Sequence, residues 1–303
     1  MPILFSNEIL SAIKDELRSA ISSVQLITAY CKEQTFDNLS SCIGDTVNEK
    51  KLLVRFRKDD VLKGSTDFNV LQKAIDLGWQ VYIRFDLHAK TYIVDNKRCF
   101  VGSANLTNAG MNVGSRGNME MATLVDMEAS DIEKIQGLYY DAISVDNSLI
   151  TKMLNQLEDR DDTAINTSSV WDAEITSMFS PKVTTLFSHE LPEMEQYNVG
   201  DIVQFLDVKF DGSKDHLKEE LRWSNAYLWL VNTLKEENGC MYFGALSERL
   251  HNALISDPKP YRRDVKQMLS NLLYMIDSLE MEDVIIDRPN YSQRIRLKEN
   301  VGL

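Results

Sequence analysis

The chain has 303 residues, which is long enough for two domains that each bury a hydrophobic core. Its 44% hydrophobic and 26% charged residues are typical of a globular protein and exclude a disordered or fibrous chain. The formal net charge of -13 disfavours a nucleic-acid partner at long range, although a local cluster of basic residues can override it.

The N-terminus carries acidic residues before any apolar run of useful length. We therefore expect neither a signal peptide nor a membrane anchor, and a cytoplasmic location follows as the default. The cysteines are scattered without a CxxC pair, which indicates neither a disulfide framework nor a zinc site. We interpret all four as reduced and mostly structural: Cys31, Cys42, Cys99 and Cys240.

Taken in chain order, residues 7–85 predict helices at 7–21, 37–43 and 68–79 that alternate with strands at 23–31, 50–57 and 80–85. From residue 88 the pattern changes to strand, turn, strand, at 88–95, 96–98 and 99–105. A strand at 118–126 and a helix at 129–144 follow. This alternation predicts an α/β domain over residues 1–157, with a mixed sheet flanked by helices.

Residues 158–222 show weak periodicity, and we interpret them as a connector with some strands, one of them at 201–210. Helical patterns return at 224–239, 244–255 and 261–280, and a Pro/Asn turn separates strand-like segments at 283–287 and 293–298. Helix, helix, helix, hairpin is the element order of a winged-helix domain. Residues 223–303 are therefore predicted to form a mainly helical, winged-helix-like domain that binds DNA or protein.

A run of reactive and small residues lies between positions 88 and 105. Alternation along a strand places His88 and Lys90 on one face and Asp95 on the other. An isolated His-x-Lys most often marks an exposed strand face, but here it belongs to a larger pattern with the spacing HxKx4Dx6GSxN. Its members are His88, Lys90, Asp95, Gly102, Ser103 and Asn105.

This pattern resembles the signature of the phospholipase D superfamily, and the resemblance covers roughly residues 50–125. The preceding segment is similar to that of the superfamily's restriction-endonuclease-like nucleases; the residues that carry this likeness are Arg55, Asp60, Gly64, Ser65 and Asp67. The resemblance implies a phospholipase D-like fold and a metal-independent phosphodiesterase without a cofactor. It further implies a DNA endonuclease that acts through a phosphohistidine intermediate, in restriction or phage defence.

The residue types suit phosphodiester cleavage. A neutral imidazole such as that of His88 can attack phosphorus, and a protonated one can donate to the leaving oxygen. Lys90 can offset phosphate charge, while Ser103 and Asn105 can donate hydrogen bonds to the nonbridging oxygens. Gly102 lets the backbone come close to a ligand.

The resemblance also implies a second subunit. Family members with a single motif build the site at a twofold interface, so we expect a homodimer in which His88 faces the partner subunit's His88. In related nucleases an acidic residue at the position of Glu120 orients the histidine; an exposed strand glutamate is the alternative reading. Asp95 is interpreted as a structural ion-pair partner.

Basic residues outside the motif are candidates for binding phosphate or nucleic acid. Arg55 and Arg57 share a face of the 50–57 strand and suit either a phosphate-binding rim or a solvated edge. Two C-terminal groups are candidates for nucleic-acid contact: Arg262, Arg263 and Lys266 in the 261–280 helix, and Arg294, Arg296 and Lys298 in the hairpin.

Three alternatives to a DNA nuclease remain. RNA cleavage would leave the motif unchanged, as would cleavage of a phospholipid or small phosphodiester, although no membrane segment is present. A noncatalytic nucleic-acid-binding adaptor is the third, and the intact motif argues against it. A helicase or other defence-system protein is a candidate partner, and we expect no membrane partner.

Overall fold

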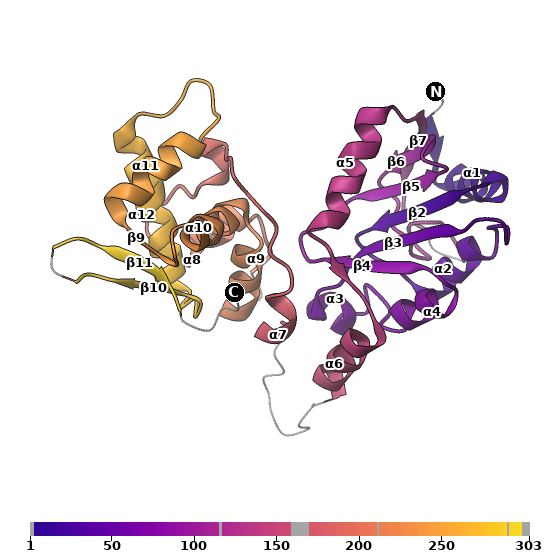
Figure 1. Ribbon diagram of the computed structural model, residues 1–303, viewed down its shortest axis with the longest axis horizontal. Helices are drawn as coiled ribbons and strands as arrows, with labels where there is room; N and C mark the ends of the chain where they lie inside the picture. Colours follow the sequence, from indigo (N-terminus) through magenta and orange to yellow (C-terminus); the bar gives the residue numbers. More distant parts are fainter. Residues whose placement is uncertain (1–2, 115–116, 159–169, 211, 290, 299–303) are drawn as a thin grey trace. The chain divides into compact units, whose positions relative to one another are not determined.

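In the computed structural model the chain divides into two compact units, Met1–Phe179 and Ser180–Leu303 (Figure 1). The structure describes residues 3–114, 117–158, 170–210, 212–289 and 291–298. The segment predicted to be a connector is divided between the two units. No helix within these described ranges is both long enough and apolar enough to cross a membrane.

The N-terminal unit is built on an eight-stranded mixed sheet with the strand order β1-β7-β6-β5-β2-β3-β4-β8. The strands are β1 (Ile3–Phe5), β2 (Ser23–Thr28), β3 (Glu49–Arg55), β4 (Gln80–Arg84), β5 (Lys90–Val94), β6 (Arg98–Gly102), β7 (Met121–Asp126) and β8 (Ile143–Ser144). Strands β2, β3 and β4 are parallel, whereas β5, β6 and β7 form an antiparallel meander that joins them through β2. This architecture confirms the predicted mixed sheet.

Helices flank the sheet, as predicted. They are α1 (Ser6–Ser19), α2 (Glu33–Ser40), α3 (Lys58–Leu62), α4 (Val70–Asp76), α5 (Ala129–Tyr140), α6 (Asn147–Glu158) and α7 (Ala173–Thr176). Figure 1 shows α5 on one face of the sheet and α1, α2 and α4 on the other. Helix α1 buries Ile9, Ile13 and Leu17 at helical spacing but ends at Ser19, two residues before the predicted end, so that Ile21 is 75% exposed.

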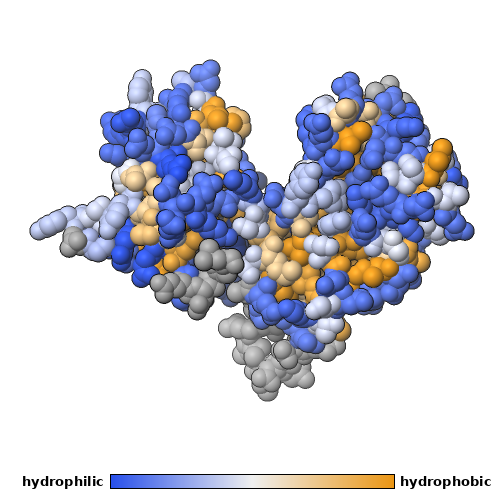
Figure 2. All heavy atoms as spheres, in the orientation of Figure 1, coloured by the Kyte–Doolittle hydropathy of each residue, from blue (hydrophilic) through white to orange (hydrophobic). Residues whose placement is uncertain are grey.

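Figure 2 shows hydrophilic residues over much of the surface and hydrophobic residues gathered around β4 of the N-terminal unit. Aromatic rings account for part of the packing in this unit. The rings of Phe56 and Trp171 are stacked with centroids 6.3 Å apart, and Phe85 meets Phe179 edge to face at 5.5 Å. The indole N–H of Trp171 also donates to the backbone oxygen of Phe56 at 2.7 Å. These contacts fix residues 171–179 to the N-terminal unit.

A tight hairpin turn joins β5 to β6. Asp95 and Asn96 both have left-handed backbone conformations, with φ of 54° and 52°, and the N–H of Lys97 donates to the backbone oxygen of Val94 at 3.0 Å. Two positive φ angles at the central positions are typical of the two-residue turn that suits twisted strands, where Asp and Asn are favoured. The turn therefore lies at residues 95–96 instead of the predicted 96–98.

The C-terminal unit is mainly helical, as predicted. Its helices are the 3-10 turn η1 (Ser188–Glu190), α8 (Val199–Leu206), α9 (Lys214–Arg222), α10 (Asn225–Glu236), α11 (Phe243–Ala253) and α12 (Arg262–Ser278). A small antiparallel sheet has the order β10-β11-β9, with β9 (Cys240–Tyr242), β10 (Val284–Asp287) and β11 (Arg294–Leu297). The predicted helices and hairpin are present, and the winged-helix assignment itself stays a prediction.

One predicted strand is a helix. Residues 199–206 form α8, because Asn198 caps its start: the side-chain oxygen accepts hydrogen bonds from the backbone N–H groups of Gly200 and Asp201, at 2.8 Å and 3.3 Å. Asp201 in turn accepts from the backbone N–H of Asn198, and Asp207 ends the helix in a left-handed conformation. The apolar run suggested a strand, whereas the capping residues determine the helix.

Candidate active site

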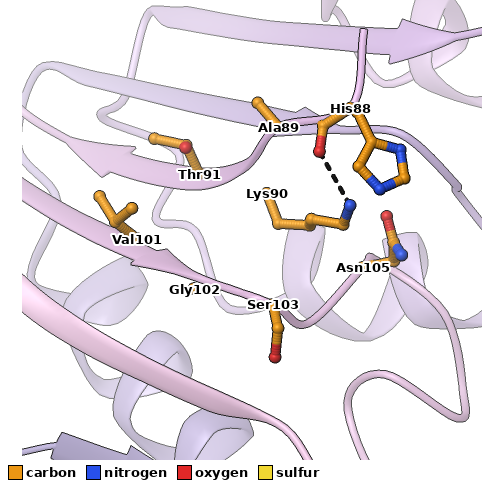
Figure 3. A pocket seen from close by; sticks show the side chains of 8 residues that line it. All are labelled: His88, Ala89, Lys90, Thr91, Val101, Gly102, Ser103 and Asn105. Atoms are coloured by element: carbon orange, nitrogen blue, oxygen red, sulfur yellow. Dashed lines mark hydrogen bonds between the residues drawn. The ribbon is translucent and has the colours of Figure 1, made fainter.

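A pocket of about 610 Å³ opens where β5 begins and β6 ends. It brings together all of the motif except Asp95. The lining residues are His88, Ala89, Lys90, Thr91, Val101, Gly102, Ser103 and Asn105. Figure 3 shows the His88 ring, the Lys90 ammonium group and the Asn105 amide close together, with the Ser103 side chain directed away from them.

His88 lies just before β5, not within the strand as predicted, and its side chain is exposed at the mouth of the pocket. Partial burial lowers the pKa of its imidazole below the ordinary value. Neighbouring cations lower this pKa further, in the order Lys90, Arg55 and Arg57. Because the pKa is lowered, the ring is largely neutral near pH 7, which is the form that can act as a nucleophile.

Lys90 is the first residue of β5 and is half-buried in the pocket. Its ammonium group donates to the backbone oxygen of His88 at 2.8 Å (Figure 3). Burial lowers the pKa of Lys90, and the charge of Arg55 lowers it further. The hydrogen bond to the chain at residue 88 holds this cation beside the imidazole, where it can offset the charge of a bound phosphate.

Asn105 is held by contacts that the sequence did not indicate. Its side-chain oxygen accepts a hydrogen bond from the backbone N–H of Tyr30 at 3.2 Å and from the hydroxyl of Thr28 at 3.4 Å. Both donors lie at the end of β2, the strand that pairs with β5. Because the oxygen is occupied, the amide nitrogen is the group left to donate to a phosphate oxygen.

Ser103 and Glu120 form a pair across β6 and β7. The Ser103 hydroxyl donates to the carboxylate of Glu120 and accepts from the backbone N–H of Met121 at 3.1 Å. The other carboxylate oxygen of Glu120 accepts from the side-chain amide of Asn118 at 3.1 Å. Ser103 was expected to donate to phosphate, but in this arrangement its proton is directed to Glu120.

Glu120 is 8% exposed, so the alternative reading of an exposed strand glutamate is wrong. The expected contact with the histidine is also absent within the described part of the chain, where the carboxylate is hydrogen-bonded to Ser103 and Asn118 instead of His88. Ser6 holds the backbone here, because its hydroxyl accepts from the N–H of Glu120 at 2.7 Å and donates to the backbone oxygen of Asn118 at 2.8 Å.

Arg55 and Arg57 do not share a strand face. Arg55 ends β3 and makes two hydrogen bonds to the buried carboxylate of Asp60, at 2.9 Å and 2.8 Å, and one to the Tyr30 hydroxyl at 2.6 Å. Its guanidinium also lies over the Tyr30 ring, 4.7 Å from the centroid. Arg57 follows the strand as the first residue before α3 and donates to the backbone oxygen of Phe85 at 2.7 Å. Strand alternation failed because β3 ends at residue 55.

Asp95 lies at the β5–β6 turn and binds backbone amides, not the cation that was expected. Its carboxylate accepts from the N–H groups of Ile21, Ser22 and Ser23 at 2.7–3.1 Å. Burial alone would raise the pKa of Asp95, but these hydrogen bonds outweigh it and lower the pKa below its usual range. The residue thereby connects the hairpin to the start of β2.

Gly102 packs closely against β7 and also lines the pocket. A side-chain carbon at this position would come within 2.4 Å of the backbone oxygen of Met121 and 2.7 Å of the Ala122 side chain. The close approach that requires glycine is therefore to the neighbouring strand, in addition to any approach to a ligand. This close approach keeps Ser103 beside the start of β7, next to Glu120.

The two groups of C-terminal basic residues differ in their surroundings. Arg294 and Arg296 in β11 both contact the carboxylate of Asp287, Arg294 through two hydrogen bonds of 2.9 Å and 2.8 Å. Their charges are therefore partly matched within the hairpin. In α12 the basic side chains are exposed, as is the side chain that follows β11; these residues are Arg262, Arg263, Lys266 and Lys298.

A metal-binding cluster is not found among the described residues, which contain no suitable group of three or more His, Cys, Asp or Glu side chains. The other three histidines of the chain, His189, His216 and His251, belong to the C-terminal unit. His88 is thus the single histidine of the N-terminal unit.

Comparisons with known proteins bear on the N-terminal unit. Residues 13–137 match the family described as "Cardiolipin synthase, PLD-like domain". This match supports the phospholipase D superfamily for that part of the chain, and with it phosphodiesterase activity in broad terms. No curated protein matches the chain.

Several solved structures are similar to part of the chain. Nuc, a phospholipase D family member from Salmonella typhimurium, is 18% identical with a TM-score of 0.39, over 48% of this chain and 96% of that one. NucT from Helicobacter pylori is 17% identical with a TM-score of 0.33, over 51% and 94%. Phosphatidylserine synthase from Haemophilus influenzae is 11% identical with a TM-score of 0.39, over 52% and 44%. Likenesses of this size carry no weight for function.

Proposed function

We propose that the chain is a metal-independent phosphodiesterase, and that its substrate is DNA. The observation that carries the proposal is the joint placement of His88, Lys90 and Asn105 around one pocket, with the pKa of the histidine lowered by its surroundings. A nucleophile, a fixed cation and an oriented amide donor are the groups that phosphoryl transfer without a metal requires.

The reaction proceeds in two displacements. The His88 imidazole attacks phosphorus, a P–N bond forms, and the P–O bond to the leaving group breaks as a second, protonated imidazole donates to the leaving oxygen. That imidazole then removes a proton from water, whose oxygen attacks phosphorus and breaks the P–N bond. Lys90 and Asn105 stabilise the charge on the nonbridging oxygens in both steps.

The second imidazole is supplied by the partner subunit's His88 in a homodimer. A second subunit is needed because the N-terminal unit has only one histidine, whereas the reaction needs both a nucleophile and a proton donor. Apolar side chains beside the pocket favour a covered surface: Val101, which lines it, is 46% exposed, and Met121 on the neighbouring strand is 55% exposed.

DNA is favoured over other phosphodiesters by two features. The segment from Arg55 to Asp67 resembles the corresponding part of restriction-endonuclease-like nucleases, which would place the protein in restriction or phage defence. The exposed basic residues at the start of α12, Arg262, Arg263 and Lys266, offer a surface for backbone phosphate in an otherwise acidic chain.

The test compares the wild type with His88→Ala in the presence of EDTA, on plasmid DNA, single-stranded DNA, RNA, phospholipid vesicles and bis(p-nitrophenyl) phosphate. His251→Ala is the matched control, because it makes the same substitution in the C-terminal unit. We expect chelator-resistant DNA cleavage that falls by roughly 10³-fold or more in His88→Ala alone.

Each other outcome has a defined meaning. Faster cleavage of RNA or phospholipid than of DNA would retain the chemistry and reject the substrate. DNA binding by a wild type that cleaves none of these substrates would establish the noncatalytic adaptor instead. Loss of cleavage in EDTA that added Mg²⁺ restores would reject the metal-independent reaction.

A further inference from the structure

A second pocket, of about 570 Å³, lies next to the one that contains His88. The start of α1 forms one side of it and the segment before β7 forms the other. The described residues that line it are Phe5, Ser6, Asn7, Asn112, Gly117, Asn118 and Met119. None of these belongs to the HxKx4Dx6GSxN pattern, and the proposed reaction uses none of them.

The lining combines an aromatic ring and a thioether with neutral side-chain amides. Phe5 is 47% exposed and Met119 is 84% exposed, so a ligand in the pocket can reach both side chains. Asn7 and Asn112 add side-chain amides that both donate and accept hydrogen bonds. A nucleobase has an aromatic face for stacking and an edge of donors and acceptors, and so matches this combination.

The Asn112 amide lies against Gly117. Asn112 has a left-handed backbone conformation with φ of 53°. A side-chain carbon at Gly117 would lie 1.7 Å from the Asn112 side-chain oxygen and 2.6 Å from its amide carbon. The amide therefore packs directly against the backbone of Gly117, where any other residue would displace it.

One carboxylate separates the two pockets. One oxygen of Glu120 accepts from Ser103, which lines the His88 pocket, and the other accepts from Asn118, which lines the second pocket. A ligand that spans both pockets would thus place a phosphate on one side of this carboxylate and a flat group on the other. A nucleotide unit has this arrangement of parts.

We propose that the second pocket binds the base adjacent to the cleaved phosphodiester, by stacking on Phe5 and hydrogen bonding to Asn112. This inference rests on the proposed function and adds to it a preference for a strand whose base is unpaired. Stacking alone accepts every base, whereas an amide beside the base edge favours some bases over others.

The experiment uses single-stranded oligodeoxythymidylates in which only the central phosphodiester is cleavable, the others being methylphosphonates. One substrate is intact, and two others lack the base on the 5′ or the 3′ side of that bond. We expect the wild type to lose about fivefold or more in kcat/KM when one of the two bases is removed, and little when the other is removed.

Phe5→Leu should abolish this discrimination, because it keeps an apolar side chain but removes the ring. The ratio of the two rates is measured within one protein preparation, so it does not depend on the fraction of folded protein. Phe187→Leu is the matched control, since Phe187 is 44% exposed and lies in the other unit. Asn112→Asp should change the order of preference among the four bases at that position.

Two results would overturn the inference, and they are distinct. If the wild type cleaves the intact substrate but base removal has no effect on either side, or has the same effect in Phe5→Leu, the pocket does not bind a base while the proposed function stands. If the wild type cleaves no oligonucleotide, the proposed function fails and the inference fails with it.

Discussion

At the scale of single residues, the pKa of the His88 imidazole depends on the charges around it. Its pKa is lowered by burial and then by the charges of three cations, Lys90, Arg55 and Arg57. Replacement of Arg57 by a neutral residue removes a positive charge, so the pKa of His88 rises toward its ordinary value. This sets up a test of the nucleophile that does not rely on loss of activity.

We expect Arg57→Gln to move the acidic limb of the pH dependence of kcat/KM to higher pH, because the neutral imidazole is then formed at a higher pH. The measurement is the pH profile on a small phosphodiester between pH 4.5 and 8. Arg18→Gln, a matched change on the exposed surface of α1, should leave the limb unchanged. An unshifted limb in Arg57→Gln would show that another group controls the profile.

Asp95 illustrates a motif residue that acts on the fold. Asp95→Asn keeps a residue type that tolerates the left-handed conformation but replaces the charged acceptor of three backbone N–H groups. We expect a loss of about 1.5–3 kcal/mol in the free energy of unfolding at pH 7, measured by urea denaturation.

The loss should depend on pH in a definite direction. The folded-state pKa of Asp95 lies below the unfolded value, so its contribution is present above the unfolded pKa and disappears as the pH falls through the folded pKa. Asp126→Asn, which affects an exposed carboxylate, is the control. Equal stability of Asp95→Asn and wild type at pH 7 would contradict this account.

At the scale of elements, the sequence specified the strands and helices better than their ends. Five of the six motif residues line one pocket, because β5 and β6 are joined by a short turn, and strand alternation had already separated the sixth, Asp95, from His88 and Lys90. The supports of the site were not predictable, because Thr28, the last residue of β2, and Tyr30, just after it, lie 77 and 75 residues from the Asn105 amide that they hold.

Two errors share a physical cause. The segment expected to be a strand at 201–210 contains helix α8, and Arg57 lies beyond the end of β3. Both errors arise because hydrophobic periodicity does not indicate where the hydrogen bonding of a strand or helix begins or ends. In both places a residue before the helix changes the backbone direction. Capping signals such as Asn198 followed by Asp201 could have found α8, whereas nothing local marked the end of β3.

The cap of α8 gives the element-scale test. We expect Asn198→Ala to lower the free energy of unfolding by about 1 kcal/mol, because two backbone N–H groups lose their acceptor. Asn69→Ala is the matched control, since Asn69 precedes α4 without a side-chain capping bond. Thermal and urea unfolding monitored by circular dichroism measure both. An equal loss in the two variants would show that the α8 cap contributes nothing specific.

At the scale of the whole molecule, the two units carry separate cores. The C-terminal core contains Tyr227, Trp229 and Leu230 from α10 together with residues from α11 and α12. The acidic balance of the chain is offset locally at the start of α12, whereas the β11 arginines are matched by Asp287.

The homodimer gives the test at this scale. We expect the wild type to sediment at twice the mass of one chain, and mixed dimers of wild type and His88→Ala, purified through two different tags, to lose roughly 10²-fold or more in activity. The loss follows because each site then lacks either its nucleophile or its proton donor. Full activity in mixed dimers, or in a monomeric wild type, would contradict a shared site.

The β5–β6–β7 meander has a consequence for how such a protein is put together. The groups of the candidate site, from His88 to Glu120, lie at or next to the ends of three consecutive strands, so a single short stretch of chain assembles them at small entropic cost. Because these groups lie so close together in the sequence, changes elsewhere in the chain leave them in place. Recombination could therefore exchange the C-terminal unit for another without disturbing the groups of the candidate site.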